Sequence, residues 1–296
     1  MIVHVVVPTF RETDLVSEFL NSWEKVDDRA IRVYVVNGNP GDETSDLIQS
    51  WSGKADVQEI CGSPVLYWTG LVCLGLRKVA EEASSDDLFV LSNIDVRFDG
   101  DPIAALRKRF DSFDGKQVTV PVVGGGGKVL SAGVVVRSWA LSRNRHLFDG
   151  IAEEELPKSE SLGATYLPTR FLVCSVSALK KGLFPAEEAL PHYTADYEYT
   201  NRLRLSGYEP VIYTGVRVRI SEENTGFDTY LLKTSLWSRL KRINDIKCAY
   251  NFCFRYRFVR LTYPLKTQVP GMVTHFAKIF VEILFGGKQI DRFRSR

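Results

Sequence analysis

The chain has 296 residues, of which 45% are hydrophobic and 25% are charged, proportions that are ordinary for a folded protein. This length allows one large α/β domain, or one domain with an appendage. The formal net charge of +2 is too small to favour nucleic acid as the main partner. The sequence contains no apolar run of about eighteen residues, so we expect no membrane-spanning helix.

Cysteine usage bears on the compartment. The five cysteines form no Cys-x-x-Cys pair, and their number is odd. A disulfide framework or a zinc site is therefore not expected, and a reducing compartment fits best. Residues 1–8 read as a first strand, because they lack the basic start and apolar core of a signal peptide. These features favour a cytoplasmic location.

The first 95 residues alternate between two patterns. Apolar, β-branched runs typical of strands buried on both faces occupy residues 2–7, 31–36, 57–60 and 88–92. Helix patterns occupy residues 13–23, 42–51 and 67–83. This alternation predicts a parallel, doubly wound sheet. Ligands of such sheets bind beyond the carboxyl ends of the strands, where the polar residues 9–12, 37–39 and 93–95 are found.

The second half of the chain departs from this alternation. Strand patterns cover residues 117–122, 128–136, 170–176 and 210–219, and a helix pattern covers residues 197–205. From about residue 221 the sequence is rich in Lys and Arg interleaved with aromatic residues. We therefore predict one domain over residues 1–225 and a helical C-terminal extension over residues 226–296.

Two carboxylates are candidates for chemistry. Asp95 follows a predicted strand in Asn93-Ile94-Asp95, and a carboxylate there can hold a divalent cation that neutralises a diphosphate. Asp196 precedes the predicted helix over residues 197–205, where the helix dipole favours the ionised form and a base could take a proton from a hydroxyl. The alternative for both is a turn or helix cap.

Two further segments suit a nucleotide. The Asn37-Gly38-Asn39 turn places amide side chains and a close backbone approach at a strand end. Tyr67-Trp68-Thr69-Gly70 opens a predicted helix, whose first amide groups attract phosphate. Trp68 is equally compatible with a core position or with a platform for an acceptor.

The order and spacing of these segments resemble the family-2 glycosyltransferases, a large inverting class with the GT-A fold. On the donor side the matching elements are Val7-Pro8-Thr9-Phe10, residues 37–44, Tyr67-Trp68-Thr69-Gly70 with Gly75, and Asn93-Ile94-Asp95. On the acceptor side they are Gly182-Leu183-Phe184-Pro185, Asp196-Tyr197-Glu198, Arg202 and Gly207-Tyr208. Residues 191–198 are most similar to a bacterial subset labelled rhamnosyltransferase-like. The resemblance covers about residues 1–220.

The resemblance implies a GT-A fold, with a mixed sheet flanked by helices, and transfer of a sugar from a nucleotide-diphosphate donor. Asp95 would hold Mg²⁺ or Mn²⁺ against the diphosphate, and Asp196 would be the general base. The implied acceptor is a glycan or a lipid-linked glycan, such as a growing bacterial surface polysaccharide. The donor-binding residues would be Pro8, Thr9, Glu12, Asn37, Trp68, Gly70, Asn93 and Asp95, and the acceptor-binding residues His192, Tyr193, Glu198 and Arg202.

The chain departs from the family pattern at several positions. Asn93 replaces the first acidic residue of the metal-binding element, Asn37 replaces an aspartate, and Ala195 replaces a glutamate. The family's late His is also missing from residues 216–220. Arg217 or Arg219 is a substitute cation for phosphate, although a solvated strand face is the simpler interpretation. These changes leave the need for a metal open.

The C-terminal extension has its own pattern. Residues 269–285 carry apolar side chains at helical spacing, which predicts an amphipathic helix. Such a helix could dock on the domain, or it could lie in a membrane interface with basic residues on anionic lipid. The sequence leaves both arrangements open.

Two other functions compete with a glycosyltransferase. A nucleotidyltransferase would need a Gly-rich loop with Arg and Lys directly after the first strand, and residues 8–12 lack it. A degenerate glycosyltransferase that serves as a sugar-binding or scaffold subunit would explain the changes at positions 37, 93 and 195.

Overall fold

The structure is a computed structural model that describes residues 1–23, 26, 30–51, 56–220, 236–246, 248 and 250–285. Its centre is an eight-stranded mixed sheet with the order β11-β13-β6-β12-β4-β1-β2-β3. The strands of this sheet are β1 (Val3–Thr9), β2 (Ile31–Asn37), β3 (Asp56–Cys61), β4 (Leu88–Ser92), β6 (Lys116–Thr119), β11 (Ser161–Gly163), β12 (Phe171–Ser175) and β13 (Glu209–Tyr213).

The first four strands form the parallel half of the sheet, as the alternation of strands and helices predicts. β1 pairs with both β2 and β4, and β2 pairs with β3, all in parallel. Burial is complete along β1 and β4, which explains their unbroken apolar sequences. The carboxyl ends of these strands consequently lie at one edge of the sheet.

The other half of the sheet is built around β12, which runs antiparallel to both β4 and β6. The predicted strand over residues 210–219 is wrong as one element, because it is divided into β13 and β14 (Val218–Ile220). A turn at residues 214–215 separates the two strands, and there the Thr214 amide donates to the carbonyl of Glu160 while its hydroxyl accepts from the Glu160 amide. The chain then turns into a second sheet.

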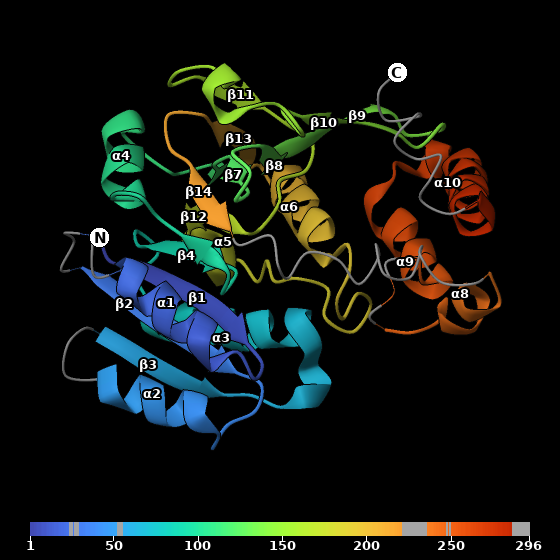
Figure 1. Cartoon of the computed structure of the whole chain (residues 1–296). Coiled ribbons are helices and arrows are strands. Elements are labelled where there is room, and N and C mark those ends of the chain that lie inside the picture. Colours follow the sequence, from blue (N-terminus) through green and yellow to red (C-terminus); the bar gives the residue numbers. More distant parts are fainter. Residues whose placement is uncertain are drawn as a thin grey trace.

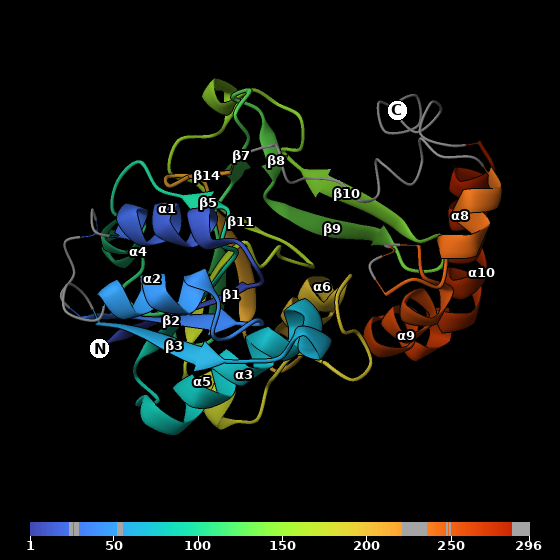
Figure 2. The same ribbon diagram turned by 60° about the horizontal axis from the view of Figure 1, so that its bottom comes forward.

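That second, four-stranded sheet has the order β5-β14-β7-β8. The predicted strands over residues 117–122 and 128–136 are each likewise divided, into β6 and β7 and into β8 and β9. The bounds are β5 (Val96–Arg97), β7 (Val122–Val123), β8 (Val129–Ser131), β9 (Gly133–Ser138) and β10 (Arg143–Leu147). β9 and β10 form an antiparallel hairpin that extends toward the C-terminal helices (Figure 2).

Helices cover both faces of the large sheet (Figures 1 and 2). One face carries α1 (Thr13–Trp23), α2 (Glu43–Trp51) and α4 (Pro102–Arg109), whose buried residues share one core cluster. The opposite face carries α3 (Tyr67–Glu82), α5 (Ser177–Lys180) and α6 (Ala195–Leu205). Short 3-10 turns, η1 (Pro64–Leu66) and η2 (Glu153–Glu155), precede α3 and follow β10.

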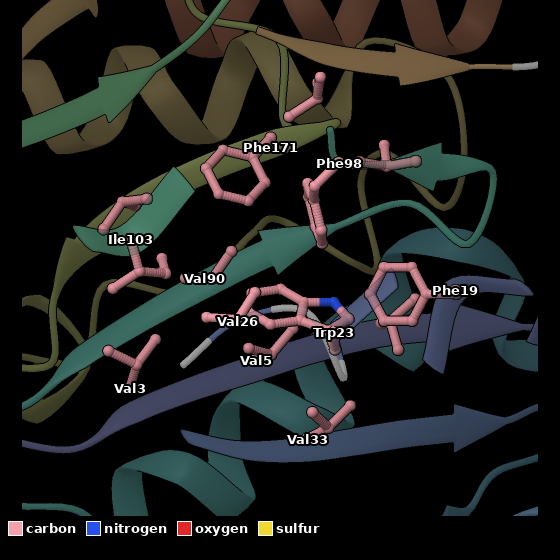
Figure 3. Packing of buried hydrophobic residues seen from close by; sticks show 14 of the residues in the cluster. Val3, Val5, Phe19, Trp23, Val26, Val33, Val90, Phe98, Ile103 and Phe171 are labelled. Carbon is pink, nitrogen blue, oxygen red and sulfur yellow. The ribbon is translucent and has the colours of Figure 1, made fainter. Parts of the chain in front are cut away.

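The core on the α1 face is rich in aromatic side chains (Figure 3). Phe19 and Trp23 of α1 pack with Phe98, and the Trp23 and Phe98 ring centroids lie 4.8 Å apart. Phe98 in turn packs against Phe171 of β12. Ile94 is buried in the same cluster, which anchors the Asn93–Asp95 turn that follows β4. The aromatic core therefore supports the strand end that bears the candidate site.

Three helices follow the domain: α8 (Leu236–Arg242), α9 (Phe252–Thr262) and α10 (Leu265–Phe285). α9 and α10 contact the domain, and α8 packs on α10. Phe254 and Phe258 of α9 share a buried cluster with Tyr166 and with Ala195 of α6. The predicted helix over residues 269–285 starts four residues earlier and contains Pro270. The predicted boundary between residues 225 and 226 lies outside the described residues.

Gly75 offers a test of the packing between α3 and the sheet. A Cβ at this position would lie 2.5 Å from Val6 Cγ1 and 2.8 Å from Val36 Cγ2. In an exposed helix, Gly→Ala stabilises by up to about 1 kcal/mol. Here the clash dominates, so we expect Gly75→Ala to destabilise the fold by about 1–3 kcal/mol in urea unfolding. Gly125→Ala, which meets no atom within 4 Å, is the control and should change little. Equal stabilities of both variants would contradict this packing.

Candidate active site

A cavity of about 460 Å³ opens where five segments that are distant in the sequence meet. β4 and β12 pair in antiparallel register with Phe171 opposite Ser92, so the end of one strand adjoins the start of the other. The Asn93 amide donates to the carbonyl of Arg170 at 3.2 Å. The start of α6 closes the third side. The lining residues are Trp68, Asn93, Leu130, Ser131, Pro168, Thr169, Arg170, His192, Tyr193, Thr194, Asp196 and Tyr197.

Asp196 lies in the first turn of α6 and lines this cavity. Burial raises the pKa of its carboxyl from 3.8 to about 6, although nearby positive charges, including those of Arg170 and Arg255, oppose the rise. A base whose pKa lies just below neutral pH is ionised in the cell and still takes up a proton readily. Asp196 is therefore a cavity-lining carboxylate with a raised pKa, and its role as a general base stays a prediction.

The backbone before Asp196 is held in an uncommon conformation. Thr194 caps α6 with φ 66° and ψ 0°, in the left-handed region that β-branched residues rarely adopt. Such strain persists where the surroundings impose it, and it concentrates at functional sites. The Thr69 amide donates to the Pro191 carbonyl at 3.1 Å, which ties the start of α3 to this loop. Trp68, His192 and Tyr193 reach the cavity from these two tied segments.

Asn93 and Asp95 present oxygen atoms next to the cavity. Asn93 Oδ1 and Asp95 Oδ1 are buried, and neither has a hydrogen-bond partner among the described residues. Burial is the main cause that raises the pKa of Asp95, and burial likewise raises the pKa of Glu12. The negative charge of Asp95 also raises the pKa of Glu12, after the larger effect of burial.

These oxygens suit a hard divalent cation. Mg²⁺ is commonly held by one or two carboxylates together with substrate phosphates and water, and Asp95, Glu12 and Asn93 supply donors of that kind. Within the described residues, no three His, Cys, Asp or Glu side chains gather to form a metal site without a substrate. The donor set therefore fits a cation that arrives with phosphate, and it does not form a closed protein cage.

Asn37 occupies a different environment from the one predicted. Its side chain is fully buried, and its amide donates to Glu59 at 2.9 Å and to Asp42 at 3.2 Å. Its carbonyl oxygen accepts from the Asn39 amide at 2.9 Å. These bonds organise the loop after β2, and a direct contact with a nucleobase stays a prediction.

The remaining donor-side residues lie at the end of β1 and at the start of α3. Pro8 and Thr9 are buried at the end of β1, where the Thr9 carbonyl accepts from the Gly38 amide. Gly70 is buried in the first turn of α3. A second, more open hollow of about 610 Å³ lies over the loops after β1 and β2. Its lining residues are Arg11, Thr13, Asn39, Gly41, Asp42, Glu43 and Asp46.

Two predicted acceptor residues lie away from the cavity. Glu198 is 3% exposed and accepts from Arg202 Nε at 2.9 Å, one helical turn along α6. This pair braces α6 and does not contribute to the cavity lining. The late-strand cations are also engaged, because Arg217 and Arg219 both pair with Glu153 at 3.0 Å. Both guanidinium groups are thus engaged with a carboxylate, and a contact of either one with phosphate stays a prediction.

Arg170 is the residue that the sequence did not single out. It stands directly before β12, a position that reads as an ordinary strand start. Its importance arises from the antiparallel pairing with β4, which no local pattern reveals. Thr169, which precedes Arg170, and Ser131, which ends β8, also line the cavity and were likewise not singled out in the sequence. In the sequence, the one feature that could have drawn attention to Arg170 is its place directly before a buried apolar run.

The effect of Asp196→Asn on the stability of the protein should depend on pH. Because the folded-state pKa of about 6 lies above the ordinary 3.8, the folded protein binds more protons between these values, and its stability falls as pH rises through them. Asp196→Asn removes the loss of stability that ionisation of the buried carboxyl causes. We expect the difference in melting temperature, Asp196→Asn minus wild type, to be more positive at pH 7.5 than at pH 4.5. A difference that is independent of pH would contradict the raised pKa.

No family model and no curated protein sequence matches this chain. Solved structures do match its fold. TarS of S. aureus, residues 1–349 with UDP, has 13% identity and a TM-score of 0.56 over 95% of this chain and 91% of that one. GalNAc-T7 with UDP, GalNAc and Mn²⁺ has 11% identity and a TM-score of 0.60 over 96% and 54%.

A mannosyltransferase from Pyrobaculum calidifontis, in complex with GDP-Man and Mn²⁺, has 14% identity and a TM-score of 0.53 over 99% of this chain and 78% of that one. In a longer TarS structure the chain spans only 44% of the length. At these identities the likeness concerns the fold alone. The large mixed sheet, the helices on both faces and these neighbours together show that the chain has the GT-A fold of glycosyltransferases.

Proposed function

We propose that this chain is an inverting glycosyltransferase that moves a sugar from a nucleotide-diphosphate donor to a hydroxyl group of a glycan or lipid-linked acceptor. The observation that carries the proposal is that Asp196 and Asn93 line the same cavity at the end of β4. This arrangement supports a base on the side of the cavity opposite the strand end where the donor diphosphate would bind. The fold neighbours were solved with UDP, UDP-GlcNAc and GDP-Man, which supports a nucleotide sugar as the donor.

The reaction would proceed in one displacement. Asp196 takes the proton of the acceptor hydroxyl as its oxygen attacks the anomeric carbon. The bond from that carbon to the diphosphate breaks on the opposite face, and its electron pair leaves with the nucleoside diphosphate. Configuration at the anomeric carbon therefore inverts. Trp68, His192 and Tyr193 would hold the acceptor, because they line the cavity beside Asp196.

Mg²⁺ or Mn²⁺, held by Asp95 with Asn93 and Glu12, would supply positive charge to the diphosphate when bound. The chain's own part is to present the three oxygen donors at the ends of β1 and β4. The buried Asn93 Oδ1 and Asp95 Oδ1 atoms, which have no hydrogen-bond partner in the described part of the chain, support this assignment. A role in bacterial surface polysaccharide synthesis and a rhamnosyltransferase-like specificity follow from the sequence resemblance and belong to the same proposal.

The role of Asp196 can be tested by separating binding from transfer. We expect Asp196→Asn to lower the rate of sugar transfer by about 10²–10⁴-fold, because the general base is lost. Nucleotide-sugar binding, measured by calorimetry or thermal shift over a panel of donors, should remain. Asp111→Asn, an exposed carboxylate change beyond α4, serves as the control. Full transfer by Asp196→Asn would remove Asp196 from this role, and binding without transfer by the wild type would favour a sugar-binding subunit.

The C-terminal helices support a peripheral position on a membrane. Five apolar side chains lie on one face of α10 at helical spacing and are exposed: Leu265, Val269, Val273, Phe280 and Leu284. Residues 236–285 contain nine Lys or Arg and two Asp or Glu, so this region is strongly basic. Among the described residues no helix is long and apolar enough to cross a bilayer. An exposed apolar face in a basic region suits the interface of an anionic membrane. A position there would bring the enzyme to a lipid-linked acceptor.

Cosedimentation with lipid vesicles tests the membrane proposal on the intact chain. Val273→Glu with Phe280→Glu places two charges on the exposed face, and we expect it to reduce binding to anionic vesicles by at least about tenfold. Leu205→Glu, at an exposed leucine that ends α6, should leave binding unchanged. Equal binding of both variants, or absence of wild-type binding to anionic vesicles, would contradict the proposal.

A further inference from the structure

Arg170 is the only Lys or Arg among the described residues that line the cavity. Its backbone is fixed, since its carbonyl accepts from the Asn93 amide and from the Ser92 hydroxyl, both at 3.2 Å. The flanking residues Thr169 and Phe171 are buried. The cation therefore projects from a rigid part of the sheet into the space between the Asn93–Asp95 turn and α6.

The guanidinium of Arg170 makes no hydrogen bond or ion pair with any described residue. Other arginines near the site differ in this respect. Arg97 donates to Glu18 and to the carbonyls of Ile94 and Val96, and Arg219 pairs with Glu153 and Asp99. Arg170 alone of these three keeps all its donors available. A partly buried cation without a partner is costly unless an anion joins it.

The charge of Arg170 acts on both sides of the cavity. It lowers the pKa of Asp95 and the pKa of Asp196, against the larger effect of burial on each carboxyl. Its positive charge is thus within electrostatic range of both carboxylates, but neither carboxylate forms an ion pair with it. The region between these carboxylates is where the diphosphate of the donor would lie under the proposed function.

We propose that Arg170 binds the diphosphate of the nucleotide sugar and carries part of the neutralisation that a divalent cation would otherwise provide alone. The inference rests on the proposed function and extends it. A planar guanidinium matches phosphate oxygens with two parallel hydrogen bonds, so it can orient the leaving group as well as offset its charge. It also compensates for the missing first carboxylate at Asn93, because a site with fewer acidic ligands holds a metal less tightly.

The test measures nucleoside diphosphate binding, with UDP, GDP, dTDP and CDP as the probes, by calorimetry in EDTA and again in Mn²⁺. We expect the wild type to bind one of these probes measurably in EDTA. Arg170→Gln should weaken that binding by about ten- to a hundredfold, which is the effect expected for one charge-assisted contact. The loss should be smaller in Mn²⁺, because the metal then shares the diphosphate charge.

Two matched variants separate charge from folding. Arg170→Lys keeps the charge and should retain binding within about tenfold of the wild type. Arg109→Gln makes the same chemical change on the exposed end of α4 and should bind as the wild type does. Wild-type melting temperatures in all three variants would show that the fold is intact.

Three outcomes would overturn the inference. Binding by Arg170→Gln equal to that of the wild type in EDTA would remove Arg170 from the diphosphate site and leave the proposed function standing. Wild-type binding that disappears in EDTA and returns in Mn²⁺ would assign the neutralisation to the metal alone. Failure of the wild type to bind any of the four probes in either condition would reject the proposed donor class together with the role of Arg170.

Discussion

The antiparallel pairing of β12 with β4 is the constraint on which the candidate site depends. β4 belongs to the parallel half of the sheet, so its carboxyl end lies beside those of β1 and β2. Because β12 runs the opposite way, its first residue lies next to the last residue of β4. Arg170 and Asn93 meet for this reason alone, although 77 positions separate them in the sequence. A parallel β12 would have placed Arg170 at the other edge.

Burial of acidic side chains is the second physical feature of the site. Glu12, Asp95 and Asp196 all have a pKa that burial raises. Glu198, on the next turn of α6, differs from these carboxylates because it forms an ion pair with Arg202. The positive charge of Arg170 acts on Asp95 and Asp196, and buried charged groups gathered at a cavity are common where charge develops during a reaction.

The C-terminal helices are part of the same packed body as the site. α9 buries Phe254 and Phe258 against the residues that position α6. The Tyr263 hydroxyl donates to Ser142 at 3.0 Å, and Ser142 donates to the Gly271 carbonyl at 2.9 Å. One face of α10 thus joins the domain, and the opposite face stays exposed. Docking on the domain and contact with a membrane are therefore compatible, although the sequence presented them as alternatives.

The sequence by itself determined the parallel half of the sheet and its helices, because buried strands and amphipathic helices leave periodic patterns that are local. It also determined which strand ends are polar, and so pointed to Asp95 and Asp196. Only the tertiary structure decided which of those residues share a cavity. It moved Asn37, Glu198 and Arg202 into supporting contacts and brought Arg170 to the site, since strand direction and register depend on pairings between segments far apart in the chain.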